Sequence, residues 1–571
     1  MESSPCTRNW PLRSAGGLLL LIPYVLQCSA IRSRGIDPDE LEHLHAAFCV
    51  WRGLLPYRDF FEHHSPALYY LLQPAFWIYG PELQVLWLGR AAMSLMSLAT
   101  VVITWQLAKL LKGETAAWTA SLLLAWSSVY VLKGTELRPD VPACLCLALM
   151  TYFAVRSLGS ARFLDWLGIG LLGGLATLFT QKGIVPVVSL AISLVLVHSV
   201  HHRRIADDLA IAFTPHATFK PTAAWIPFLG IGLGGTIVWT LLAITFAGFE
   251  ALHKLLAGTV DQLVRLPIQS ERWEHLRPTI AADLTLWLAG LLYLIVVARE
   301  LARRQGEPLP QIVATACGGC LLSLAWVKAV YPQYVLLWLP WLAVTAATAL
   351  DLIGRSTNRR VSMAILGLTL LISGIECKLL LDGLRDSPTS ALSHLRTLWI
   401  TWHIPPIAAL ILPIGLVAWS AFLFQSASAR SWLVFPMAIL GMSYAVARDA
   451  NGWLWSNRPQ VALIERVNSL ASLEETVLDG FSGYGALRPH ASYFWWINRY
   501  SLALMTSQDK AQLLKLLEDR SPAVVLYDRE LKSWLEIQAP LEAGYSPTAE
   551  PPIWIRRRLS GGLKFPRAGA P

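Results

Sequence analysis

Long apolar runs are the feature that most constrains this chain, because about 20 apolar residues in a helix cross the hydrocarbon core of a membrane. Of 571 residues, 54% are hydrophobic and only 15% are charged, whereas soluble domains carry about 25% charged residues. The sequence therefore predicts an α-helical polytopic membrane protein with about thirteen spans. We expect these spans at residues 14–31, 85–108, 115–132, 140–157, 163–180, 184–200, 223–247, 281–298, 310–329, 333–353, 361–380, 404–424 and 432–448.

Lys and Arg gather in alternate short loops, and such residues mark the cytoplasmic side. They include Lys109 and Lys112, the "HHRR" at 201–204 and the "RSTNRR" at 355–360. This pattern predicts an integral protein of a bacterial inner (plasma) membrane with a cytoplasmic N-terminus. The net charge of +9 is spread over these loops, so nucleic acid is not an expected partner.

With this orientation, the first loop and the last segment lie outside the cytoplasm. The stretch 67–80 is short and contains Pro74, so we interpret it as a partly embedded helix rather than a span. The last segment has mixed charge and a β-like run, "PAVVLYD", at 522–528, which predicts a small α/β domain. The expected domains are residues 1–448, with the first outer loop at 32–84, and an extracytoplasmic domain at 449–571.

The first outer loop begins with "GIDPDELEHLHA", which concentrates carboxylates and imidazoles at the membrane surface. If Pro38 opens a helix, Asp39, Glu42 and His43 share one face, whereas Glu40 points elsewhere. Acidic residues in a first turn can simply complement the helix dipole. Polar residues held near a membrane are costly unless they serve a site, and the loop carries five more of them: Arg58, Asp59, Glu62, His63 and His64.

Further cations, tyrosines and carboxylates lie at the outer ends of other spans. A single Lys or Arg at such a position is usually an anchor whose charge reaches the lipid headgroups. Several of them on the side where positive charge is disfavoured predict a shared cavity in the outer leaflet. These residues are Arg90, Lys133, Glu136, Arg138, Asp140, Lys182, Lys328, Tyr331 and Tyr334.

This combination fits the transfer of a sugar from a polyprenyl-phosphate carrier. A carboxylate would remove the proton of an acceptor hydroxyl, and cations would hold the phosphate leaving group. The sequence contains no P-loop, and its two GxGxxG matches, at 168–173 and 230–235, lie within expected apolar spans, so nothing indicates a nucleotide-binding fold.

The same motifs resemble a known family. "DPDELEHLHAAFCVWRGLLPYRDFFEHHSPALYY", "RPD", "FTQKG" and "YPQY" look like the protein O-mannosyltransferase and lipid A aminoarabinose transferase superfamily of membrane glycosyltransferases, which has the GT-C fold. The resemblance implies that Asp39, paired with Glu40, is the catalytic base. It also implies that Lys182, Lys328 and Tyr334 bind the lipid-phosphate donor. Where the aminoarabinose enzymes have Glu-Lys-Pro, this chain has "HHSP", so sugar and acceptor specificity do not carry over.

The function that follows is an inverting glycosyltransferase that acts on the outer face of the membrane on a lipid, glycan or protein acceptor. Asp39 would accept the proton, and Lys328, Arg138 or Arg90 would stabilise the departing phosphate. The expected site comprises catalytic Asp39 and Glu40, donor-binding Arg90, Arg138, Lys182, Lys328, Tyr331 and Tyr334, and acceptor- or sugar-binding His43, Arg58, Asp59, His63, His64 and Asp140.

Two alternatives and the question of a metal stay open. A transporter or flippase also needs a cavity lined with cations, but the sequence shows no repeated halves. A non-catalytic lipid-binding subunit is disfavoured only by the carboxylates. Asp37 and Asp39 form a D-x-D, but His43 and His45 do not share a helix face. We therefore predict no cofactor and assign no metal ligand, while metal dependence stays open.

Overall fold

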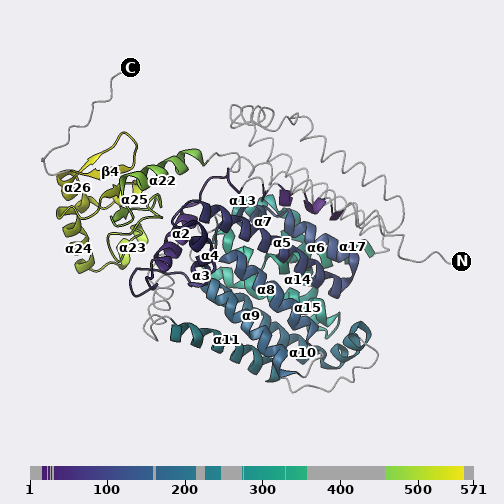
Figure 1. Cartoon of the computed structure of the whole chain (residues 1–571). Coiled ribbons are helices and arrows are strands. Elements are labelled where there is room, and N and C mark those ends of the chain that lie inside the picture. Colours follow the sequence, from purple (N-terminus) through teal and green to yellow (C-terminus); the bar gives the residue numbers. More distant parts are fainter. Residues whose placement is uncertain are drawn as a thin grey trace, which may run out of the picture. The chain divides into compact units, whose positions relative to one another are not determined.

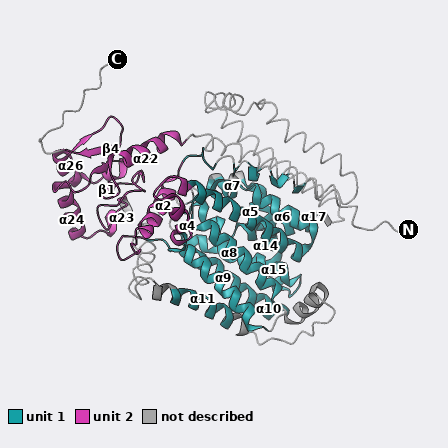
Figure 2. Cartoon of the chain, in the orientation of Figure 1, with its two compact units in different colours: residues 1–35, 63–68, 87–456 teal, residues 36–62, 69–86, 457–571 magenta. Residues whose placement is uncertain are grey.

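The computed structural model describes residues 16–17, 19–21, 23–25, 27–28, 31–158, 162–213, 225–245, 273, 276–327, 330–355 and 457–557. The chain divides into two compact units, which Figure 2 shows in different colours. Unit 1 comprises residues 1–35, 63–68 and 87–456, and unit 2 comprises residues 36–62, 69–86 and 457–571. Each unit combines segments that are distant in the sequence. The sequence-based division at residue 448 stays a prediction.

Unit 1 is built from helices (Figure 1). α9 packs against both α8 and α11, α10 against α15, and α17 against α14 and α6. The elements are α5 (Gln84–Lys112), α6 (Glu114–Ala125), α7 (Ser128–Lys133), α8 (Asp140–Arg156), α9 (Phe163–Phe179), η1 (Gln181–Gly183), α10 (Ile184–Phe213), α11 (Trp225–Thr245), α13 (Arg277–Ala282), α14 (Leu284–Ala302), α15 (Pro308–Ser323), η2 (Leu324–Trp326), α16 (Pro332–Leu336) and α17 (Leu339–Arg355).

Four helical segments in the described part of the chain are long and apolar enough to cross a membrane. They are Gln84–Lys112, Gln181–His201, Leu284–Ala302 and Pro308–Trp326. These helices support an integral membrane protein, whereas the count of about thirteen spans stays a prediction. The expected spans at 361–380, 404–424 and 432–448 lie outside the described residues.

One predicted span, 115–132, is interrupted in the structure. α6 ends at Ala125 and α7 begins at Ser128. The fully buried Asp283 accepts hydrogen bonds from the Ser127 hydroxyl at 2.6 Å and the Ser128 backbone N–H at 2.8 Å. The N–H groups in the first turn of a helix have no carbonyl partner within the helix, and the Asp283 carboxylate accepts from one of them in α7. A residue about 155 positions away therefore decides where the helix breaks.

α9 and α11 approach closely because glycines face one another. A Cβ atom placed on Gly234 would lie 2.6 Å from the backbone of Gly170, and one on Gly170 would lie 2.5 Å from the carbonyl oxygen of Ile231. Membrane helices commonly use small residues in this way, because apolar side chains gain little by leaving lipid for one another. Alanine at either position would push the two helices apart.

Unit 2 contains a four-stranded sheet with the order β1-β2-β4-β3. β1 and β2 are parallel, and β4 is antiparallel to both β2 and β3. β2 lies within the strand predicted at 522–528. The elements are α2 (Pro38–Trp51), α3 (Ala67–Leu71, which unit 1 shares), α4 (Gln73–Tyr79), α22 (Arg458–Leu470), β1 (Val477–Asp479), α23 (Arg499–Leu504), α24 (Ser507–Glu518), β2 (Val524–Leu526), α25 (Arg529–Lys532), η4 (Leu535–Ile537), α26 (Gln538–Gly544), β3 (Tyr545–Pro547) and β4 (Ile553–Arg556).

Alternate residues of the strands pack on opposite faces of this sheet, as the twofold period of a strand requires. Val477 and Val524 belong to a buried cluster with Val467 of α22. Leu478 and Val525 belong to a second cluster that contains residues of α24, α25 and α26. Both faces of the sheet are therefore covered. The placement of the sheet outside the cytoplasm stays a prediction.

The stretch 67–80 forms two short helices, α3 and α4, and not one span. Pro74 lies in the first turn of α4, where a missing N–H costs least. Gln73 donates from its amide to the carbonyl oxygens of Tyr69 at 2.7 Å and Ala47 at 3.1 Å. The second bond ties α4 to α2 within unit 2.

Candidate functional site

The predicted catalytic motif lies at the start of α2, and its local structure is a capping box. Asp37 is the N-cap, and its carboxylate accepts from the backbone N–H of Asp39 at 3.0 Å. In return, the Glu40 carboxylate accepts from the backbone N–H of Asp37 at 3.0 Å. Pro38 occupies the first turn, where its fixed φ favours the helix. These local contacts fix the turn that carries Asp39.

Burial separates the two acids that the sequence predicts as catalytic. The Glu40 side chain is fully buried, whereas Asp39 is partly exposed. A carboxylate that is buried and completes a capping box is not available to a substrate. The structure therefore favours a helix-capping role for Glu40 over the predicted catalytic role, and it leaves Asp39 as the accessible acid of the pair.

Two other segments of unit 2 contact the beginning of α2. Gln460 of α22 makes two hydrogen bonds of 2.8 Å with the backbone of Ile36, one to its N–H and one to its carbonyl. Gly483 has a φ of +74° and lies so close to Leu41 that a Cβ atom there would be 2.5 Å from the Leu41 Cβ. Only glycine combines this backbone conformation with such an approach. Ile36 and Leu41 flank Asp39 in the chain, so both contacts position the proposed base.

The loop that contains Gly483 is organised by a buried carboxylate. Asp479, at the end of β1, accepts hydrogen bonds from the Ser482 hydroxyl at 2.8 Å and from the backbone N–H groups of Gly483 at 3.3 Å and Gly485 at 3.0 Å. Burial and, to a lesser extent, the nearby carboxylate of Asp528 raise the pKa of Asp479, the three hydrogen bonds lower it, and the net result is a pKa of about 6.

Because the pKa of Asp479 is raised, the stability of the folded protein depends on pH, and the sign of this dependence follows from the shift. The carboxyl keeps its proton between about pH 4 and pH 6 in the folded chain, whereas the unfolded chain loses it near pH 4. The stabilising contribution is therefore present below about pH 4 and is lost as pH rises through about 6. Relative to the Asp479→Asn variant, we expect the thermal midpoint of the natural protein to decrease as the pH rises from about 4 to about 7. A difference that stays constant with pH would contradict this.

Arg90, predicted to bind the donor, instead holds the chain just before the catalytic motif. Its guanidinium donates to the carbonyl oxygens of Ile31 at 2.9 Å, Arg34 at 3.2 Å and Gly35 at 2.9 Å. The side chain is 1% exposed and stacks near the Trp87 ring. Three carbonyl contacts and this burial favour a positioning role over the predicted phosphate contact.

Arg138, also predicted to bind the donor, belongs to a buried cluster of three cations and one carboxylate. The Glu136 carboxylate lies 2.5 Å from Arg138, 2.5 Å from Arg34 and 2.8 Å from Lys133. Arg34 also donates to the Thr135 hydroxyl at 3.0 Å. Burial opposes ionisation of Glu136, but the cations outweigh it and hold the pKa well below its usual value. The four charged side chains together carry two net positive charges.

A second group brings four predicted site residues together. Lys182, in the turn between α9 and α10, lies 3.5 Å from the carboxylate of Asp140 at the start of α8. Its ammonium group also lies 4.6 Å from the centre of the Tyr334 ring. Tyr331 makes an edge-on contact with Tyr334 at 5.9 Å. Lys182 stays about one third exposed, whereas Asp140 is buried, so the cation is the accessible member.

The other predicted residues make contacts of their own, and His63 lies next to the Lys182 turn, since its carbonyl oxygen accepts from the Gln181 amide at 2.7 Å. Arg58 and Asp59 pair with each other at 2.7 Å, and Asp59 also accepts from the backbone N–H of Leu55. The rings of His63 and His64 lie 4.0 Å apart in unit 1. His43 is buried on α2 in unit 2, with its ring 6.2 Å from that of Tyr69. Lys328 lies outside the described residues.

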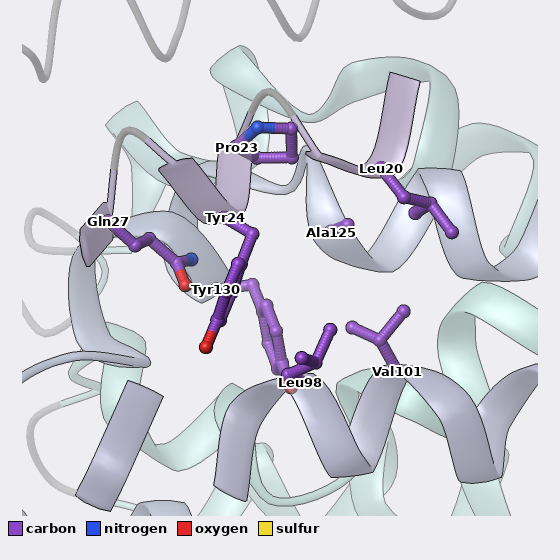
Figure 3. Close-up of a pocket in the computed structure, with 8 residues that line it drawn as sticks. All are labelled: Leu20, Pro23, Tyr24, Gln27, Leu98, Val101, Ala125 and Tyr130. Carbon is purple, nitrogen blue, oxygen red and sulfur yellow. The ribbon is translucent and has the colours of Figure 1, made fainter. Parts of the chain in front are cut away.

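Figure 3 shows a mostly apolar recess in unit 1, whose described lining includes none of the predicted site residues. Its empty volume is about 280 Å³. The polar groups that line it are Gln27 and the hydroxyls of Tyr24 and Tyr130. Among the described residues that line it, none supplies a carboxylate to act as a base or a cation to hold phosphate. The remaining lining residues are Leu20, Pro23, Leu98, Val101 and Ala125.

The sequence predicts Lys133, Glu136 and Arg138 in one short stretch beside the outer cavity, but it does not predict Arg34 as the fourth member of the buried charge cluster. Arg34 is 102 residues from Glu136, and nothing in the local sequence joins the two. Only the tertiary structure makes this contact visible.

Comparison with known proteins identifies the architecture. The family model for dolichyl-phosphate-mannose-protein mannosyltransferases matches residues 63–225, less than a third of the chain. Among solved structures, ArnT from Cupriavidus metallidurans bound to undecaprenyl phosphate is similar, with a TM-score of 0.59 and 14% identity over 89% of this chain and 92% of that chain. The chain has the GT-C fold. The predicted resemblance to GT-C membrane glycosyltransferases is therefore confirmed.

Two further solved structures were compared with this chain. ArnT in the apo state has a TM-score of 0.57 and 13% identity over 89% of this GT-C chain and 91% of that chain. AglB from Archaeoglobus fulgidus, in complex with an inhibitory peptide and a dolichol-phosphate, has a TM-score of 0.47 and 12% identity over 97% and 75%. Comparison with the curated proteins finds no match.

Proposed function

We propose that the protein is a glycosyltransferase that moves a sugar from a polyprenyl-phosphate carrier to an acceptor on the outer face of the membrane. The observation that carries this proposal is the accessible Asp39 on a capped, rigidly held helix start of a GT-C chain. Catalytic groups are most effective when their surroundings fix them before the reaction. The capping box, Gln460 and the Gly483 contact supply such fixation for Asp39.

The reaction would be a single inverting displacement. Asp39 accepts the proton of the acceptor hydroxyl while that oxygen attacks the anomeric carbon. The bond from the anomeric carbon to the phosphate oxygen breaks, and its electron pair leaves with the lipid phosphate. A base in hydrogen-bond reach contributes about 10²- to 10⁴-fold to such a step.

The leaving phosphate needs positive charge, and the structure supports two sources of it. The Glu136 cluster carries three cations and one carboxylate. Lys182 is the accessible cation beside Asp140 and Tyr334.

The direct test uses the full chain in reconstituted membranes. A panel of radiolabelled polyprenyl-phosphate sugars would be supplied together with membrane lipid, glycan and protein acceptors. We expect the label of at least one donor to move from the organic phase to an acceptor, and free polyprenyl phosphate to be released in equal amount. Transfer of intact labelled lipid between leaflets without cleavage would instead support a flippase.

Lys182→Gln tests the donor contact. This substitution removes the positive charge but keeps a polar side chain beside Asp140 and Tyr334. Because losing a contact to a developing charge typically costs about a hundredfold or more, we expect kcat/KM for the donor to fall on that order. Lys109→Gln is the control, since Lys109 is an exposed residue that pairs with Glu114 at 3.2 Å. Equal activity of the two variants would remove Lys182 from the donor site.

A further inference from the structure

A cluster of three metal-ligating side chains in unit 2 is separate from the groups that the proposed reaction uses. His45 and Cys49 lie one turn apart on α2, and His490 comes from the loop after β1. We propose that these three residues bind one Zn²⁺ ion. The proposal rests on the geometry of the cluster and not on the proposed glycosyltransferase function.

The distances between the three donor atoms fit a zinc ion. His45 Nε2 lies 3.0 Å from His490 Nδ1, and the Cys49 sulfur lies 3.4 Å and 3.5 Å from these two nitrogens. Tetrahedral zinc with ordinary bond lengths would hold two nitrogens about 3.3 Å apart and a nitrogen and a sulfur about 3.6 Å apart. The site needs shifts of only a few tenths of an ångström to accept the ion.

The hydrogen bonding of His45 presents the correct nitrogen to this centre. Its Nδ1 lies 3.0 Å from the carbonyl oxygen of Ala486. Because a carbonyl only accepts, Nδ1 carries the proton and Nε2 turns its lone pair toward His490 and Cys49. A backbone carbonyl that fixes the second nitrogen of a histidine is a common feature of zinc ligation.

Without a metal, a proton on His490 Nδ1 can bridge the two nitrogens as an ordinary hydrogen bond. Zinc would replace that bridge, since the His490 proton would move to Nε2 and the Cys49 thiol would release its proton to solvent. The ion would then bond His45, His490 and the thiolate, and a water would complete the fourth position. Soft sulfur with two imidazoles favours zinc over magnesium or calcium.

The surroundings of the cluster suit a buried metal ion. His45 is 2% exposed, and Cys49 is 1% exposed. The Trp495 ring lies 4.0 Å from that of His45, and the Phe60 ring lies 6.0 Å from that of His490. The ion would bond α2 to His490 within unit 2 and thereby fix the helix that carries Asp39.

The experiment uses the full chain in detergent, stripped with a chelator and titrated with Co²⁺ or Zn²⁺ alone. We expect one Co²⁺ per chain, with a thiolate-to-cobalt charge-transfer absorption that an equivalent of Zn²⁺ abolishes. Cys49→Ser should lose this absorption and weaken Zn²⁺ binding by at least about tenfold. Cys146→Ser is the matched control, since Cys146 is also buried but lies on α8 in unit 1, and it should bind as the natural protein does.

A second variant keeps the test decisive if Cys49→Ser does not fold. His490→Cys replaces one ligand by another, so a metal site would keep Co²⁺ binding and gain thiolate absorption. A hydrogen-bonded cluster without metal would show neither effect. Co²⁺ binding without thiolate absorption, or equal Zn²⁺ affinity in Cys49→Ser and the natural protein, would overturn the proposal. Because no readout involves sugar, failure here and failure of the proposed function are distinguishable.

Discussion

Asp39→Asn is expected to reduce sugar transfer by about 10²- to 10⁴-fold while leaving membrane insertion and fold intact. Asparagine has nearly the same size as aspartate but cannot accept the proton of the acceptor hydroxyl. The Asp37 carboxylate accepts a hydrogen bond from the backbone N–H of Asp39 and not from its side chain, so the substitution leaves the helix cap in place. Initial rates with saturating labelled donor, measured on protein of equal thermal midpoint, would give the effect.

Two neighbouring substitutions are matched controls for Asp39→Asn. Asn is as good an N-cap as Asp, so Asp37→Asn keeps the cap and removes only a charge. Gln preserves the capping box, so Glu40→Gln keeps the fold of the first turn. We expect both variants to retain most of the activity. Near-normal transfer by Asp39→Asn would remove Asp39 from the base role, and inactivity of Asp37→Asn would indicate that the two aspartates act as a pair.

Glu136→Gln is expected to destabilise the folded protein by about 3–5 kcal/mol, the usual cost of removing one partner from a buried ion pair. The substitution leaves Arg34, Lys133 and Arg138 around a neutral amide at the positions where Glu136 now accepts from all three. Their mutual repulsion in a buried site is stronger than it would be in water. A marked fall in the thermal midpoint of the purified chain would show the effect.

The control for this prediction is an ion pair at the surface. Glu114 lies 3.2 Å from Lys109, and the Lys109 side chain is 45% exposed. Exposed pairs contribute about 0–1 kcal/mol, so Glu114→Gln should leave the thermal midpoint almost unchanged. If the two variants were equally stable, the Glu136 cluster would be a solvated group and not a buried one.

The start of α2 shows how much local sequence can predict. Pro38 opens the helix as expected, and Asp39 stays accessible. The sequence also predicted Glu40 as catalytic, and the structure instead buries it within the capping box. The motif carried both possibilities, because an acid three residues after an N-cap can serve a site or a cap. Burial, which depends on the rest of unit 2, decides between them.

Arg90 and Asp283 show what local sequence does not contain. Arg90 was predicted from its position near a span end, but its role depends on the carbonyl groups of Ile31, Arg34 and Gly35. Asp283 interrupts a predicted span by capping α7. Both contacts join segments more than 50 residues apart. Hydropathy and motif spacing describe neighbours along the chain and carry no information about such pairs.

The sequence by itself determined the membrane class, the GT-C resemblance and the acid-bearing helix start, because apolar length, capping residues and short motifs act over a few turns of chain. Tertiary structure decided which charged groups meet. It joined Arg34 to Glu136, placed Lys182 beside Asp140 and Tyr334, and brought His490 to His45 and Cys49. A buried charge or ligand needs partners whose identity depends on how distant segments pack, and that packing is a property of the whole fold.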